Sequence, residues 1–146
     1  MNKLLLVLLL LPLLSKSQDK ILFIELENTI FEIANRNFYI SKVIDERKDK
    51  AITWIIQKRG VNHKLNAQFK DGSEAAIFNF ISNSLPKEEG QKEILIKIID
   101  LQLSEITLNG LKICKAILKM DFYSYDDAGH LVKVHQTGSV IEERSS

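Results

Sequence analysis

Residues 93–125, "EILIKIIDLQLSEITLNGLKICKAILKMDFYSY", decide the fold of this chain. Two apolar runs flank Asn109-Gly110, and an Asn-Gly pair between two such runs is a strong signal for a tight hairpin turn. Every second residue from Cys114 to Phe122 is apolar, whereas Lys115 and Lys119 occupy intervening positions. Because side chains alternate between the faces of a strand, this stretch predicts two long antiparallel strands with one apolar face.

Further strands are expected on both sides of this hairpin, in runs rich in β-branched and aromatic residues. Glycines between these runs, such as Gly60 and Gly129, mark turns. In the last run Val132, Val134 and Val140 are expected to share one face. The expected strands are 20–27, 37–45, 51–59, 63–69 and 130–143, with Lys133, His135 and Thr137 facing outward in the last.

One amphipathic helix is predicted at about residues 73–85, within "DGSEAAIFNFISNSLP". Ile77, Ile81 and Leu85 lie four residues apart, which places them on one helical face. Pro86 ends the helix because the residue before a proline is pushed out of helical geometry. Asp71 or Ser73 is expected to cap the first amides, and Glu74 places a carboxylate in the first turn, where it is favourable.

The order of these elements predicts an α+β fold, with a mostly antiparallel sheet of five or six strands and the helix on one face. A helix with its side chains is about 10 Å wide, whereas neighbouring strands lie about 4.8 Å apart. One helix therefore covers about two strands, and apolar sheet surface is left over. Three outcomes stay open: the sheet folds on itself, a partner covers it, or the chain lacks a C-terminal helix.

The amino terminus has the pattern of a signal peptide. Lys3 precedes an apolar run from Leu4 to Leu14, and Ser15 and Ser17 supply small residues before the expected cleavage site. Eleven apolar residues are too few to span a bilayer, which takes about 20. We therefore predict a signal peptide at 1–17, a single domain at 18–146 with no transmembrane segment, and an exported protein, periplasmic or secreted.

Composition excludes several classes of function. The signal peptide contains two lysines, so removing it changes 20 Lys and Arg against 19 Asp and Glu into 18 against 19. A near-neutral chain without a basic block is not expected to bind nucleic acid. Cys114 is the single cysteine, so no disulfide forms within the chain. Its apolar strand neighbours indicate a small core residue rather than a nucleophile.

The most concentrated charge lies at Asp45–Lys50, between two apolar runs. One interpretation takes Asp45 and Arg47, with the nearby Trp54, as ligand-binding residues, since arginine binds carboxylates in a bidentate manner and tryptophan lines binding surfaces. The sequence favours the other interpretation, in which a strand leaves the sheet and ion pairs stabilise its exit. Asp45 and Glu46 are adjacent and point to opposite faces of a strand, which makes them a poor acid–base pair.

No histidine pair has the spacing of a metal site, and no glycine-rich phosphate loop or serine nucleophile motif is present in the sequence. We therefore expect no catalytic residues, no metal and no cofactor. The alternative is a small secreted hydrolase that uses Asp45 or Glu46 with a histidine, either His63 or His135.

The stretch "SKVIDERKDKAITWI" at 41–55 resembles small uncharacterised envelope proteins of Gram-negative bacteria, the YajG-type periplasmic lipoproteins. The resemblance covers about residues 38–85 and implies a location and a fold, but no catalytic residues. The chain departs from that pattern in having no lipidation cysteine and no second helix after the last strands. The expected function is non-enzymatic: binding another protein or a cell-surface component, or self-association, through an exposed sheet face.

Overall fold

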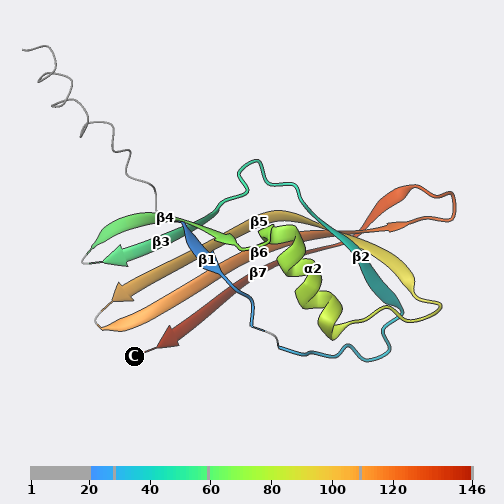
Figure 1. Ribbon diagram of the computed structural model, residues 1–146, viewed down its shortest axis with the longest axis horizontal. Helices are drawn as coiled ribbons and strands as arrows, with labels where there is room; N and C mark the ends of the chain where they lie inside the picture. Colours follow the sequence, from blue (N-terminus) through green and yellow to red (C-terminus); the bar gives the residue numbers. More distant parts are fainter. Residues whose placement is uncertain (1–20, 28, 59, 109, 146) are drawn as a thin grey trace, which may run out of the picture.

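The computed structural model describes residues 21–27, 29–58, 60–108 and 110–145; the predicted signal peptide at 1–17 lies outside them. Within the described residues, one helix and seven strands form the α+β fold that the sequence predicts (Figure 1). The helix is α2 (Gly72–Ser84). The strands are β1 (Leu22–Ile24), β2 (Phe38–Asp45), β3 (Ile52–Lys58), β4 (Val61–Phe69), β5 (Lys92–Leu108), β6 (Leu111–Tyr125) and β7 (Leu131–Ser145).

All seven strands belong to one mixed, mostly antiparallel sheet in the order β1-β4-β3-β5-β6-β7, with β2 also paired to β5. The prediction of five or six strands was therefore wrong in number. Only three residues of the expected first strand, 20–27, form β1, and they pair in parallel with the end of β4. The hairpins β3–β4, β5–β6 and β6–β7 are antiparallel, as predicted. Gly60, Gly110 and Gly129 have the positive φ angles that their tight turns require.

β2 and β3 share one edge of β5, and both run parallel to it. Asp45 lies opposite Ile98, and Thr53 lies opposite Gln102. The chain therefore advances eight residues from Asp45 to Thr53, whereas β5 advances only four residues between their partners, Ile98 and Gln102. Residues 46–51, here called the charged link, form the excursion that takes up this difference.

The predicted helix is confirmed to within one residue at each end. Its expected capping is wrong: Asp71 occupies the N-cap position but makes no side-chain hydrogen bond to the helix. At the other end the Leu85 N–H donates to the Ile81 carbonyl at 2.8 Å, and Pro86 follows. The polar side chains in the first turn of α2, Ser73 and Glu74, instead form hydrogen bonds with Arg47 and with the end of β2.

The buried apolar side chains gather beneath α2 in two adjacent clusters. Ile98 is fully buried and Ile96 is 1% exposed, both beside Ile77 of the helix. Among the described residues, neither β6 nor β7 contributes an apolar side chain to the fully buried set. The first cluster comprises Ile40, Val43, Ile77, Ile96 and Ile98, and the second Ile52, Ala67 and Phe69.

Arg36, which precedes β2, fixes the far end of α2. Its guanidinium donates to the Pro86 carbonyl at 2.7 Å and to Glu88 Oε1 at 2.9 Å, both in the segment that follows the helix. It also reaches Gln91 Oε1 at 3.1 Å and the Phe38 carbonyl of β2 at 2.8 Å. Its side chain is only 7% exposed. The helix is therefore attached to the start of β2, and no sequence pattern predicted this contact.

The predicted faces of the last strand are wrong because of a β-bulge. Phe122 pairs with His135, but the next residue, Tyr123, pairs with Lys133, so that Val134 is the extra residue. Because of this extra residue, the side chains that follow Val134 point to the faces opposite to those expected from regular alternation. His135 lies on the helix side, with its ring centroid 5.6 Å from that of Phe122, and Val140 lies on the opposite side.

Candidate functional site

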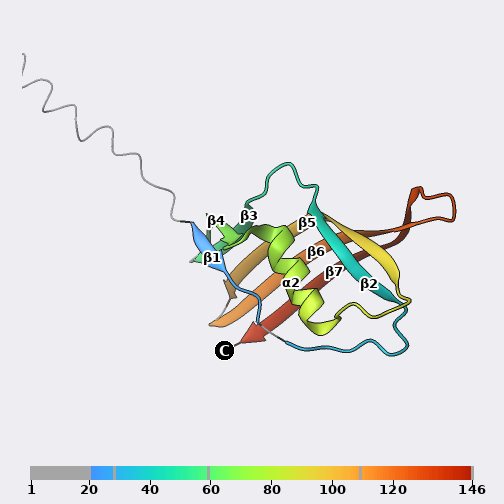
Figure 2. The same cartoon turned by 45° about the vertical axis from the view of Figure 1, so that its right-hand side comes forward.

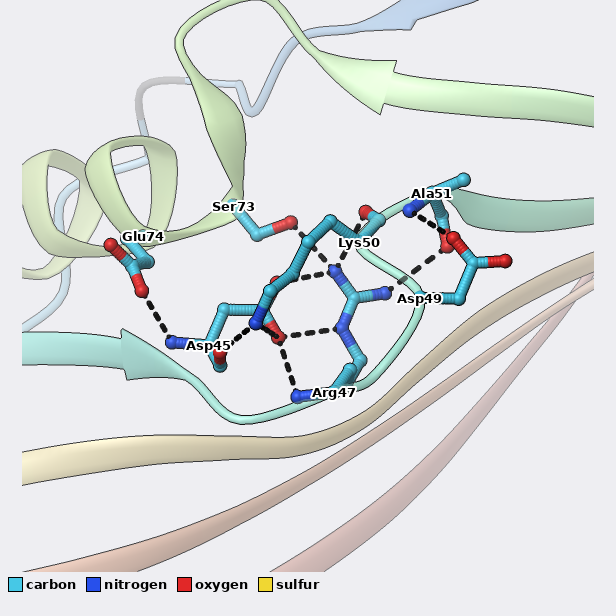
Figure 3. A network of polar contacts seen from close by, with 7 residues as sticks. All are labelled: Asp45, Arg47, Asp49, Lys50, Ala51, Ser73 and Glu74. Atoms are coloured by element: carbon cyan, nitrogen blue, oxygen red, sulfur yellow. Dashed lines mark hydrogen bonds and ion pairs between the residues drawn. The ribbon is translucent and has the colours of Figure 1, made fainter.

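Asp45 and Arg47 are paired with each other at the start of the charged link (Figure 3). Arg47 Nε donates to Asp45 Oδ1 at 2.9 Å, and Nη2 donates to Oδ2 at 2.6 Å, which is a bidentate ion pair. The Arg47 N–H donates to the same carboxylate at 3.1 Å. The two side chains are 4% and 8% exposed, so this pair is buried.

The same arginine ties the charged link to the first turn of α2. Arg47 Nη2 lies 3.0 Å from Ser73 Oγ and 3.1 Å from the Lys50 carbonyl. Glu74 Oε1 accepts the Asp45 N–H at 2.7 Å, and Lys50 Nζ donates to the Asp45 carbonyl (Figure 3). We call Asp45, Arg47, Lys50, Ser73 and Glu74 the Arg47 cluster. Sequence reasoning placed Ser73 and Glu74 in the helix start but missed their contact with β2.

Burial and charge act in opposite directions on Asp45. Burial by itself raises the pKa of its carboxyl group, because the charged form loses water. The hydrogen bonds and the charge of Arg47, helped by the charge of Lys50, outweigh burial, and the pKa of Asp45 lies below its usual value. Asp45 is therefore held as a carboxylate, which suits a structural ion pair better than a general acid.

Glu46 points away from this cluster, as predicted for a residue adjacent to Asp45. Its Oε1 atom lies 2.6 Å from Lys97 Nζ, and this bond raises the pKa of Lys97. In the described part of the chain, the polar contacts of Asp45 and Glu46 include neither His63 nor His135. His63 lies opposite Ile56 in the β3–β4 hairpin. The residues required by the hydrolase alternative are not brought together.

Trp54, the third predicted binding residue, lies apart from the Arg47 cluster in the middle of β3. It packs against the second buried cluster, and its Nε1 atom is buried without a hydrogen-bond partner. It also lines a shallow groove of about 270 Å³. We call this the open groove; its helix-side lining residues are Trp54, Leu103, Cys114, Ala116, Ile141 and Glu143.

The open groove follows from strand register. Leu103 lies opposite Trp54 on one side and opposite Ala116 on the other, and Ala116 lies opposite Ile141. Directly opposed residues point to the same face, so a row of apolar side chains runs across four strands. Trp54, Leu103 and Ala116 are half-buried, whereas Ile141 at the end of the row is 65% exposed.

The helix does not extend over this row. α2 contacts β2 and β4, and the carboxyl-terminal ends of β5 and β7 extend away from it (Figure 1). A view turned by 45° likewise shows these strand ends beside α2 rather than beneath it (Figure 2). The expectation that one helix covers about two strands is met, and apolar surface is left exposed on its own side of the sheet.

Two further findings concern the described residues alone. They contain no group of three or more His, Cys, Asp or Glu side chains placed to hold a metal ion. No helix among them is long and apolar enough to cross a membrane. No protein-family model, curated protein or solved structure matches this chain. The binding roles predicted for Asp45, Arg47 and Trp54 stay predictions, and their geometry assigns the first two a structural role.

Proposed function

We propose that this chain is an exported, non-enzymatic protein of the bacterial envelope that binds another protein through the open groove. The single observation that carries the proposal is the uncovered row of apolar side chains from Trp54 to Ile141. Exposed apolar surface on the core side of a sheet marks an interaction site more often than isolated exposed residues do. Export is supported by the signal-peptide pattern of residues 1–17.

An amphipathic helix is the partner element that best fits the open groove. The outer strands of the three-strand layer β5, β6 and β7 lie about 10 Å apart, which is the width of one helix. Such a helix would lie beside α2 and complete the layer that α2 begins. Glu143 lines the groove, whereas Glu105, opposite Cys114, is already paired with Lys112 at 3.1 Å. We therefore expect the partner helix to carry an apolar stripe with a basic residue beside Glu143.

A photo-crosslinking residue at Ile141 tests this function in the native envelope. We expect position 141 to give a discrete crosslinked product with a second protein, distinguished by its mass from a product of two copies of this chain, and Lys119, an exposed position on the opposite face of β6, to give none. A matched pair of variants then assigns the surface. Ala116→Glu places a charge in the groove and should abolish the product, whereas Lys119→Glu, on the opposite face of β6 and outside the groove, should not.

The same variants distinguish the presence of exposed apolar surface, measured by dye binding, from the binding of a specific partner, measured by crosslinking. The wild-type protein and Lys119→Glu should bind a hydrophobic dye equally, and Ala116→Glu should bind less. Equal crosslinking of a second protein from positions 141 and 119, or such a product that survives Ala116→Glu, would show that the open groove is not the binding surface.

A further inference from the structure

β7 forms a long edge of the sheet. It pairs with β6 along one side, and no strand of the described residues pairs with its other side. The strand is 15 residues long, whereas β1 at the opposite edge has three. A free edge presents unpaired backbone N–H and C=O groups, and very short edge strands are one of the ways in which proteins protect themselves from edge-to-edge pairing. β1 has that protection. β7 is long, and its β-bulge at Val134, another protective device, lies on the amino-terminal side of residues 135–141.

The side chains of β7 also leave its centre unprotected. Residues 134–141 contain no lysine, arginine, aspartate or glutamate. Val134, Val140 and Ile141 are 53%, 59% and 65% exposed. Charged residues occur only outside this central segment, at Lys133 and at 142–144. Edges that avoid pairing usually place a charge or a proline within the strand, so this distribution favours pairing at the centre.

We propose that two copies of this chain associate by antiparallel pairing of β7 with β7, about a two-fold axis at Gly138. The two sheets then become one continuous sheet across the axis. This proposal concerns the strand edge, whereas the proposed function concerns the groove on the face, so either can fail without the other.

The register follows from the faces that β6 assigns to β7. His135, Thr137 and Ile141 lie on the helix side, and Gln136 and Val140 on the other. With the axis at Gly138, every opposed pair has both members on the same face, as an antiparallel pair requires. The opposed pairs are His135 with Ile141, Gln136 with Val140, and Thr137 with Ser139.

Charge selects this register over its neighbours. Across the bulge at Val134, Lys133 of one copy lies opposite Glu142 of the other. Within its own chain Lys133 binds Asp121 and Glu142 binds Arg144, so the new contact joins two existing ion pairs and is made twice. Moving the axis to Ser139 places Lys133 opposite Arg144, two like charges. Moving it to Thr137 places Glu142 opposite Leu131 and loses the ion pairs.

Cysteine crosslinking tests both the pairing and the axis. Gly138→Cys is introduced together with Cys114→Ala, so that one thiol is present per chain. A Cβ atom at position 138 meets only Lys119 Cε, at 3.9 Å, so the substitution fits the fold. Opposed residues have Cα atoms about 4.5–5.5 Å apart, within the range of a disulfide. We expect mild oxidation to convert most of the protein into a disulfide-linked dimer.

Cysteines at Thr137 and Ser139 are the matched controls. With the axis at Gly138, two copies of either residue lie about 8 Å apart, beyond disulfide reach, so they should crosslink much more slowly. Faster crosslinking at either control position than at 138 would overturn the Gly138 axis. Crosslinking at none of the three positions would overturn the pairing.

Sedimentation velocity of the purified protein without added cysteines gives an independent readout. Gly138→Lys places two like charges at the axis and should weaken dimerisation by about fivefold, which corresponds to about 1 kcal/mol. Val61→Lys adds the same charge at an exposed position on β4 and should leave dimerisation unchanged. A protein that is monomeric at every concentration, or equally affected by both lysines, would contradict the proposal.

Discussion

Two parts of one sheet face differ in almost every physical respect. Beneath α2, Ile96 and Ile98 are excluded from water, and polar clusters at both ends of β2 attach the helix to the sheet. In the open groove, on the same face, Leu103 and Ala116 are half-buried, Ile141 is exposed, and a tryptophan N–H has no partner. The comparison shows that the position of one helix, rather than the hydrophobicity of the strands, decides which part of the sheet is core.

Two arginines contribute to that position. Arg36 precedes β2 and holds the segment after α2, whereas Arg47 follows β2 and holds the first turn of α2. These contacts hold α2 over β2, and Ser84 in its last turn also donates to the Thr29 carbonyl at 3.2 Å and accepts the Phe31 N–H at 3.3 Å. The open groove is therefore a consequence of where these contacts lie.

The largest expected effect on stability comes from a substitution in the part of the sheet face beneath α2. Ile98→Ala removes a fully buried side chain and leaves a cavity, which should lower the free energy of unfolding by about 4 kcal/mol. Ile141→Ala, on the same face but 65% exposed, should change it by less than about 0.5 kcal/mol. Urea unfolding of the two variants measures the contrast. Similar losses would mean that both parts of the face are core.

Removal of Arg47 is expected to have the next largest effect. Arg47→Ala leaves the Asp45 carboxylate, 4% exposed, without its bidentate partner and should cost about 3 kcal/mol. Arg144→Ala is the control, since that arginine also binds a carboxylate, Glu142, but is 70% exposed; it should cost less than about 0.5 kcal/mol. Equal effects in urea unfolding would remove the structural role assigned to Asp45 and Arg47.

The sequence predicted the elements better than the contacts between them. Alternation and turn residues located the hairpins, and the spacing of Ile77, Ile81 and Leu85 located α2, because these signals are local. The partners of Ser73 and Glu74 lie almost thirty residues away, and no local pattern encodes them. The bulge at Val134 exchanged the predicted faces of β7 because one extra residue reverses strand alternation.

Glu74→Gln tests the helix side of the Arg47 cluster and should have a smaller effect. Glu74 accepts the Asp45 N–H at 2.7 Å, and the neutral amide accepts a weaker bond, so we expect a loss of about 1 kcal/mol. Glu89→Gln, at an exposed position in the segment after α2, should leave stability unchanged in the same urea experiment. A loss that is equal for both would indicate a general charge effect.

Acid unfolding should show the contribution of Asp45. Its pKa is lowered in the folded protein, so the unfolded chain takes up the proton at a higher pH. The stabilisation is complete above the unfolded pKa, near the ordinary value of 3.8, and is lost as pH falls through the folded pKa. Asp45→Asn removes this linkage and should flatten the fall in stability below about pH 4. Parallel curves for the two proteins would contradict this origin.

Modification of Cys114 by a thiol reagent tests the central claim most directly, because this natural thiol lies in the open groove. If the groove is open in the folded protein, the labelling rate should be the same in the wild-type protein and in Arg47→Ala, despite their different stabilities. If Cys114 is core, labelling requires unfolding, and a loss of about 3 kcal/mol should accelerate it by roughly 100-fold. The first result is the one we predict; the second would contradict it.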